Sequence, residues 1–148
     1  HSNFQSTLNR LLELNVIPII NENDTIATQE ISVGDNDTMG AIVAENANAD
    51  LLIILSDIDG LYTGDPRNNP DAQLIDTIFS ITPEIKELAG TKGTTLGTGG
   101  MITKIHAAEI AMDAGIDMII ANGTRPELLY KILDGDKVGT KFIGRKKG

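Results

Sequence analysis

The sequence predicts an α/β protein, a three-layer sandwich in which helices cover both faces of a mostly parallel β-sheet. Helical stripes and short apolar runs alternate along the chain, which is the order that builds βα units. Residues 51–55 form an uninterrupted apolar run, typical of a parallel strand that is buried on both faces. No linker, internal repeat or low-complexity tract divides residues 1–148, so a single domain is expected.

The first third of the chain reads as helix, strand, helix, strand. Leu8, Leu11, Leu12 and Val16 form a helical stripe that stops before the apolar residues 17–20, which predict a strand. Met39, Ile42, Val43 and Ala47 repeat with helical spacing ahead of the apolar run at 51–55.

The remaining elements follow from turn residues and periodicity. Residues 60–70 hold Gly, Asp-Pro and Asn-Pro and predict a surface loop or short hairpin. The pattern then predicts a short helix at 83–88, a helix at 101–114 ended by Gly115, a strand at 117–121, a helix that begins near Pro126 and a final strand at 141–143.

Composition excludes several classes of protein. The net charge of −9 argues against non-specific binding to a phosphate backbone, so no nucleic-acid partner is expected. The absence of cysteine excludes disulfides and thiolate metal sites, and two histidines are too few for a histidine site, although oxygen-liganded cations stay open. No run approaches the roughly 20 apolar residues of a membrane helix, and cytoplasmic location is the default expectation.

Two polar tracts, residues 21–25 and 34–38, each follow apolar sequence and concentrate carboxylates and amides. Such a cluster costs desolvation and mutual repulsion unless a ligand or cation satisfies it. In α/β sheets, ligands bind beyond the carboxyl ends of strands. We therefore expect a site for a polar ligand; a solvated acidic loop is the alternative.

Residues 97–104 form a glycine-rich segment that opens a helix. Free backbone N–H groups and the positive end of the helix dipole favour a phosphate there, and Lys104 can stabilise charge on a transferring phosphoryl group. The spacing fits neither the Walker A nor the dinucleotide pattern, and glycine that merely eases a turn is the alternative. Together with the polar tracts and Ser56-Asp57 after a strand, the segment predicts phosphoryl transfer.

Two weaker signals carry no site. Asp57-Ile58-Asp59-Gly60 lacks the acidic spacing of a calcium loop and is interpreted as a strand-end turn. His106, just inside a helix, is interpreted as a packed or surface histidine rather than a general base.

Four tracts resemble the amino acid kinase family, and within it the members that phosphorylate the side-chain carboxylate of L-glutamate; they are residues 20–24, 34–37, 60–63 with 65–67, and 97–101 with 103–104. The resemblance runs through essentially the whole chain. It implies transfer of the γ-phosphoryl group of ATP to give glutamyl 5-phosphate, the first step of proline biosynthesis. Acetylglutamate, aspartate or uridylate kinase activity, and a nucleotide- or metabolite-binding module without turnover, are the alternatives.

The resemblance also implies roles for individual residues. Asn21, Asp24 and Asn36 would contact glutamate, and Asp37 would orient catalytic lysines. Lys104 would neutralise the phosphoryl transition state, and Mg²⁺ would be held mainly through the nucleotide phosphates, with no metal site of the protein's own. The expected nucleotide-binding residues are Ser56, Asp57, Thr98, Gly99, Gly100, Met101, Ile102, Thr103 and Lys104.

Compared with that family, the chain lacks the N-terminal half, which carries a first glycine-rich loop, a second lysine and a substrate-binding serine. The chain is thus expected to be a fragment and, when isolated, a poor catalyst. The resemblance further implies a homo-oligomer and feedback inhibition by proline, for which residues 25–33 are the candidate segment.

Overall fold

The computed structural model describes residues 2–21, 35–90 and 100–146 and confirms the α/β fold. None of the helices in these ranges is both long and apolar enough to span a membrane. In chain order the elements are α1 (Ser2–Glu13), α2 (Asn36–Asn46), β1 (Leu51–Ser56), β2 (Thr77–Ile78), α3 (Pro83–Ala89), α4 (Met101–Asp113), β3 (Asp117–Asn122), α5 (Leu128–Leu133) and β4 (Thr140–Phe142).

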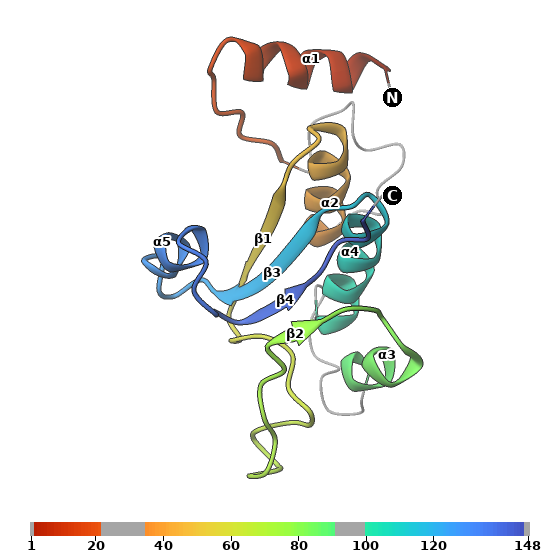
Figure 1. Ribbon diagram of the computed structural model, residues 1–148, viewed down its shortest axis with the longest axis vertical. Coiled ribbons are helices and arrows are strands. Elements are labelled where there is room, and N and C mark those ends of the chain that lie inside the picture. Colours follow the sequence, from red (N-terminus) through yellow and green to blue (C-terminus); the bar gives the residue numbers. More distant parts are fainter. Residues whose placement is uncertain (1, 22–34, 91–99, 147–148) are drawn as a thin grey trace.

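The sheet has the strand order β1-β3-β4-β2 and is mixed (Figure 1). The pairs β1/β3 and β2/β4 are parallel, whereas β3 and β4 are antiparallel. The β1/β3 ladder is in register from Leu51 opposite Asp117 to Ser56 opposite Asn122. Two of the three pairings are therefore parallel, and the carboxyl ends of β1 and β3 lie at the same edge.

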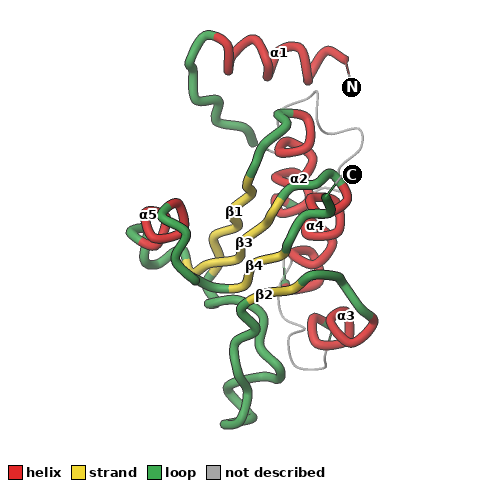
Figure 2. Tube along the Cα trace, viewed as in Figure 1, coloured by secondary structure: helices red, strands yellow, loops and turns green. Residues whose placement is uncertain are grey.

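Helices cover both faces of this sheet (Figure 2). On one face, α2 and α4 pack together, and Ala107, Ala108 and Ala111 of α4 are fully buried in the main core with Met118 and Ile120 of β3. The small alanine side chains allow the helix to approach its neighbours closely. On the other face, a smaller cluster is formed by Ile119, Ala121 and Ile132, the last of which belongs to α5.

Four helices end in the same way, on a residue with positive φ. Asn15, Asn48, Gly115 and Gly135 follow α1, α2, α4 and α5 with φ of 57°, 51°, 80° and 89°. After α4, for example, Gly115 N–H donates to the Met112 carbonyl and Ile116 N–H to the Ala111 carbonyl. This paired bonding is the Schellman arrangement, which satisfies the last carbonyls of a helix. The predicted stop at Gly115 is confirmed.

The strand predictions need three corrections. Residues 17–20 pair with none of the described strands, and Ile17 and Ile19 are 88% and 94% exposed. In β1 only Ile54 is buried and Leu55 is exposed, so this strand is less buried than predicted. The short strand β2 was not predicted, because two residues are too few to set an alternating pattern.

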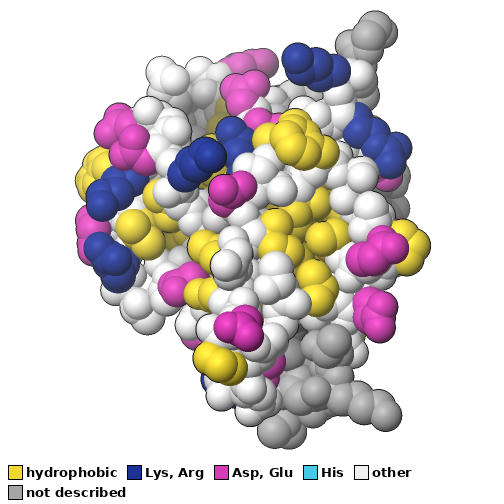
Figure 3. Space-filling model, turned by 60° about the horizontal axis from the view of Figure 1, so that its bottom comes forward, with side chains coloured by type: hydrophobic (Ala, Val, Ile, Leu, Met, Phe, Trp, Pro, Cys, Tyr) yellow, Lys and Arg dark blue, Asp and Glu magenta, His cyan; other side chains and the backbone are white. Residues whose placement is uncertain are grey.

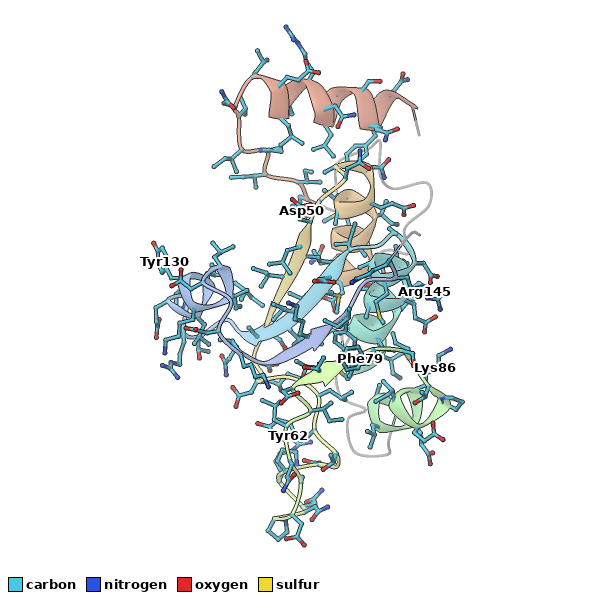
Figure 4. The ribbon with its side chains drawn as sticks, in the orientation of Figure 1. Asp50, Tyr62, Phe79, Lys86, Tyr130 and Arg145 are labelled. Atoms are coloured by element: carbon cyan, nitrogen blue, oxygen red, sulfur yellow. The ribbon has the colours of Figure 1, made fainter. Side chains whose placement is uncertain are left out.

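Residues 60–75 leave the sheet as a hairpin-like excursion, as predicted, and Figure 4 shows Tyr62 within it, beyond the sheet. Both ends of this excursion are hydrogen-bonded to Thr140 of β4. The fully buried Thr140 hydroxyl accepts a hydrogen bond from Leu61 N–H at 2.9 Å and donates one to the Ile75 carbonyl at 2.6 Å. Further out, hydrogen bonds from the Arg67 side chain and backbone lower the pKa of the Asp65 carboxyl.

Gly139→Ala tests how tightly the turn into β4 is packed against β3. At this position φ is +63°, and an added Cβ would meet the Ile120 carbonyl oxygen at 1.8 Å. The expected loss of unfolding free energy, measured by urea denaturation, is about 3 kcal/mol or more, because backbone strain and a backbone clash add. The matched control is Gly135→Ala, with φ of +89° and nothing within 4 Å, which should lose only about 1 kcal/mol. Equal losses in the two variants would contradict this account.

Candidate active site

The N-terminal ends of α2 and α4 lie together at the edge of the sheet where β1 and β3 end. Each helix directly precedes the strand it packs against, α2 before β1 and α4 before β3, so it runs opposite to that strand. Because β1 and β3 are parallel, both helix starts point to the carboxyl ends of these strands (Figure 1). This is the edge at which α/β sheets bind ligands.

The start of α2 displays the second polar tract. Asp35 is the N-cap, and its Oδ1 accepts from the Thr38 backbone N–H at 2.9 Å, which satisfies one of the free donors of the first turn. The helix therefore begins with Asn36 exposed to solvent and Asp37 half-buried. An aspartate cap thus places an amide and a second carboxylate at the ligand edge.

The start of α4 has no such cap. Gly100 precedes it in an extended conformation, no side chain caps the helix, and its first turn holds no acidic residue. The first backbone N–H groups and the positive end of the helix dipole therefore keep their attraction for an anion. This supports the phosphate role expected for Gly100, Met101 and Ile102.

Asp37 connects the two helices. Its Oδ2 lies 2.8 Å from Thr103 Oγ1 and 3.2 Å from Lys104 Nζ, and only 9% of the Lys104 side chain and 16% of the Asp37 side chain are exposed. A buried ammonium needs such a partner. A lysine in the first turn of a helix also faces the positive end of the dipole, which disfavours a cation. A lysine at this place is unusual on grounds of stability, which makes Lys104 a candidate for contact with an anionic ligand.

A second polar group lies where β1 and β3 end. Gly123 N–H donates to the Ser56 carbonyl at 2.7 Å, and Asn122 Nδ2 donates to Asp59 Oδ1 at 3.0 Å. Tyr62 hydroxyl donates to Asp59 Oδ2 at 3.2 Å; partial burial, followed by the nearby Asp59 charge, raises the pKa of this hydroxyl. These bonds join both strand ends to the base of the excursion.

Ser56 and Asp57, which were expected to bind nucleotide, sit at this strand end. Ser56 Oγ donates to Asp57 Oδ1 at 3.3 Å and accepts from Ile58 N–H at 3.4 Å. Figure 3 turns this end of the molecule forward and shows acidic side chains spread among exposed hydrophobic ones. In the described ranges no group of three or more histidine or acidic residues could hold a metal ion by itself.

The structure brings together only some of the predicted site residues. Asp37, Thr103 and Lys104 are in direct contact, Asn36 adjoins them in sequence, and Asn21 is exposed at the end of the segment that follows α1. Asp24, Thr98 and Gly99, together with residues 25–33, lie outside the described residues. Their predicted roles remain predictions.

Sequence reasoning missed Thr38 and assigned no site to His106. Thr38 Oγ1 is hydrogen-bonded to Asp35 and lies 3.2 Å from His106 Nδ1 on α4. The signal that could have found Thr38 is its place three residues after Asp35, the spacing at which an N-cap side chain bonds the first turn.

Comparison with known proteins gives the family. The sequence model of the amino acid kinase family matches residues 1–122. The chain is 52% identical to the glutamate 5-kinase of Clostridium perfringens (strain 13 / Type A) over 98% of its own length and 55% of that relative, so it spans about half the relative's length.

Solved structures with the same fold include other kinases. UMP kinase from Ureaplasma parvum aligns with a TM-score of 0.66 at 16% identity, over 94% of this chain and 52% of that one, which shows the fold alone. Carbamate kinase from Giardia lamblia, solved with AMP-PNP bound, aligns with a TM-score of 0.54 at 28% identity, over 75% of this chain and 36% of that one.

Asp37→Asn tests whether the buried ion pair is intact in solution. The variant leaves the Lys104 ammonium buried without its carboxylate, so the unfolding free energy measured in urea should fall by about 3 kcal/mol. The matched control is Glu109→Gln, which breaks the exposed Lys86–Glu109 pair at 3.5 Å and should cost less than about 0.5 kcal/mol.

An Asp37→Leu, Lys104→Met double variant should recover most of that loss, because packed apolar side chains can replace a buried ion pair. Equal losses for Asp37→Asn and Glu109→Gln would contradict the burial of the pair.

Proposed function

Because this chain belongs to the amino acid kinase family, we propose that the gene product containing it transfers the γ-phosphoryl group of ATP to the side-chain carboxylate of L-glutamate. A carboxylate oxygen of glutamate forms the new P–O bond, the bond between the γ-phosphorus and the β,γ-bridging oxygen breaks, and ADP leaves. The products are glutamyl 5-phosphate and ADP. The 52% identity to a glutamate 5-kinase supports this acceptor over those of the uridylate and carbamate kinases, which share the fold at 16–28% identity.

The observation that carries the proposal is the Lys104 ammonium at the uncapped start of α4. Lys104 belongs to the first turn of this uncapped helix, so a phosphoryl group at the helix start would meet a full positive charge and the helix dipole together. In phosphoryl transfer the negative charge is spread over the equatorial oxygens of the transition state. Lys104 stabilises that charge.

Asp37 acts in this proposal as a positioning residue and not as a base, since a carboxylate acceptor has no proton to lose. It accepts from Lys104 Nζ at 3.2 Å and from Thr103 Oγ1 at 2.8 Å, which holds both groups toward the start of the helix. Its negative charge also offsets the cost of keeping an ammonium buried when no substrate is bound.

The proposal divides the predicted site residues between the two substrates. Asn21, Asp24 and Asn36 bind glutamate, whereas Ser56, Asp57 and residues 98–104 bind ATP. The ATP analogue AMP-PNP in the related carbamate kinase supports nucleotide binding by this fold. Mg²⁺ enters on the nucleotide phosphates.

Four further expectations belong to the same proposal. They are a place at the start of proline biosynthesis, feedback inhibition by proline, a homo-oligomeric assembly and a cytoplasmic location. The first follows from the product, because glutamyl 5-phosphate is the activated form of glutamate that the pathway reduces. The exposed Ile17 and Ile19 are apolar surface that an assembly, or further chain, would cover.

Lys104→Met tests the central assignment in the full gene product. Methionine keeps the apolar stem that packs in the core but removes the ammonium. With ATP, Mg²⁺, glutamate and hydroxylamine, the wild type should form γ-glutamyl hydroxamate, and the variant should lose about 100-fold or more in kcat. Lys86→Met removes an exposed ammonium of α3 (Figure 4), which pairs with Glu109; it is the control and should keep wild-type activity.

Three results would overturn the proposal. Full activity in Lys104→Met would remove the lysine from the mechanism. A wild type that phosphorylates acetylglutamate, aspartate or uridylate in preference to glutamate would identify another member of the family, and calorimetric nucleotide binding without any turnover would favour a binding module.

Asn36→Leu tests the proposed glutamate-binding residues separately. Asn36 is exposed at the first position of α2, so its loss should leave the fold intact. The KM for glutamate should rise about tenfold, the scale of one or two lost hydrogen bonds, while the KM for ATP stays within about twofold. A larger rise in the KM for ATP than for glutamate would contradict the division of the site.

A further inference from the structure

A second polar contact joins α2 to α4 next to the Asp37–Lys104 pair. Thr38 Oγ1 is hydrogen-bonded to the Asp35 carboxylate and lies 3.2 Å from Nδ1 of His106. Thr38 is buried, whereas His106 is exposed. Asp35, Thr38 and His106 thus form a continuous chain, here called the capping relay, from the N-cap of α2 to the second turn of α4.

Counting protons gives the direction of each bond in the capping relay. A threonine hydroxyl has a single proton and can donate only once, while its oxygen can also accept. The charged Asp35 oxygen is the stronger acceptor, so Thr38 donates to Asp35 and accepts from His106. His106 must then carry a proton on Nδ1, which is possible in the neutral ring as well as in the charged one.

We infer that His106 is a positioning residue for the phosphoryl-transfer site, an inference that rests on the proposed function. The capping relay joins α2 to α4 next to the residues of the proposed site. Thr38 follows Asn36 and Asp37 in the first turn of α2, and His106 lies three residues after Thr103 and two after Lys104 in α4. The Asp37 contact joins the starts of the two helices at one residue of α2. The capping relay adds a second polar contact, from the next residue Thr38 to α4.

This arrangement explains why a histidine that is no general base sits beside the site. His106 acts through Thr38, so its effect falls on the placement of Asn36 and Asp37 and not on the proton balance of the reaction. Misplacement of such groups by a fraction of an ångström lowers the rate of the chemical step. Because His106 is exposed, its loss should affect placement far more than folding.

Kinetics of the full gene product test the inference with three variants. His106→Leu should lower kcat for glutamate phosphorylation about five- to tenfold, the scale of one lost hydrogen bond, with KM for ATP within about twofold of wild type. His106→Asn, whose amide N–H can take the place of Nδ1–H, should restore kcat to within about twofold. Thr38→Val should lose as much as His106→Leu, and the double variant no more than either, because both break the same relay.

Failure to rescue with His106→Asn, or a wild-type kcat in His106→Leu, would overturn the inference. So would additive losses in the double variant.

A spectroscopic readout separates this inference from the proposed function. The ¹⁵N chemical shifts of the His106 ring report which nitrogen carries the proton, whether or not the protein turns over glutamate. The expected result is a ring that carries a proton on Nδ1, which changes toward the Nε2–H form in Thr38→Val. If the wild type does not phosphorylate glutamate, the proposed function fails. The protonated nitrogen of the His106 ring still tests the capping relay: a proton on Nδ1 supports it, whereas a proton on Nε2 alone in the wild type overturns it.

Discussion

The buried contact between Asp37 and Lys104 is the constraint on which the rest of the site depends. The two residues are 67 positions apart and come from different helices, yet their side-chain atoms lie 3.2 Å from each other. Two charges removed from water cost free energy that their attraction does not fully return. An apolar pair would stabilise α2 against α4 at least as well. The pair therefore indicates a need for a positive charge at the start of α4, with the carboxylate present to hold it.

The scaffold around this pair is built to make the two helix starts meet. Parallel β1 and β3 are joined in register along six residues, and the chain returns to each of them through a helix that ends on a left-handed residue, Asn48 or Gly115. The tight turn between each helix and the following strand fixes the position of the helix relative to that strand, and therefore also the position of its first residue. Alanines in α4 then let it pack closely on α2 and the sheet. Backbone turns at the opposite ends of α2 and α4 thus contribute to the positions of Asp37 and Lys104.

Periodicity and turn chemistry predicted most elements, because those signals are local. The helices α2, α3 and α4, the strand β3 and the stop at Gly115 follow from residues within each segment. The failures involve long-range partners. Residues 17–20 have strand-like composition but pair with no described strand, and β2 exists because β4 lies beside it. Burial of β1 was overestimated for the same reason, since an apolar run cannot show which face a helix covers.

For the site, the sequence by itself determined the chemical groups: carboxylates and amides after apolar runs, a glycine-rich helix start and a lysine within it. These follow from residue type and from the local rules of helix caps and strand ends, which need no partner. Only the tertiary structure decided which groups meet. The family resemblance implied that Asp37 orients lysines; its contact with Lys104, and the contact of Thr38 with His106, depend on the rotation of α2 against α4. Such rotation is set by packing between segments distant in sequence, where no local pattern carries the information.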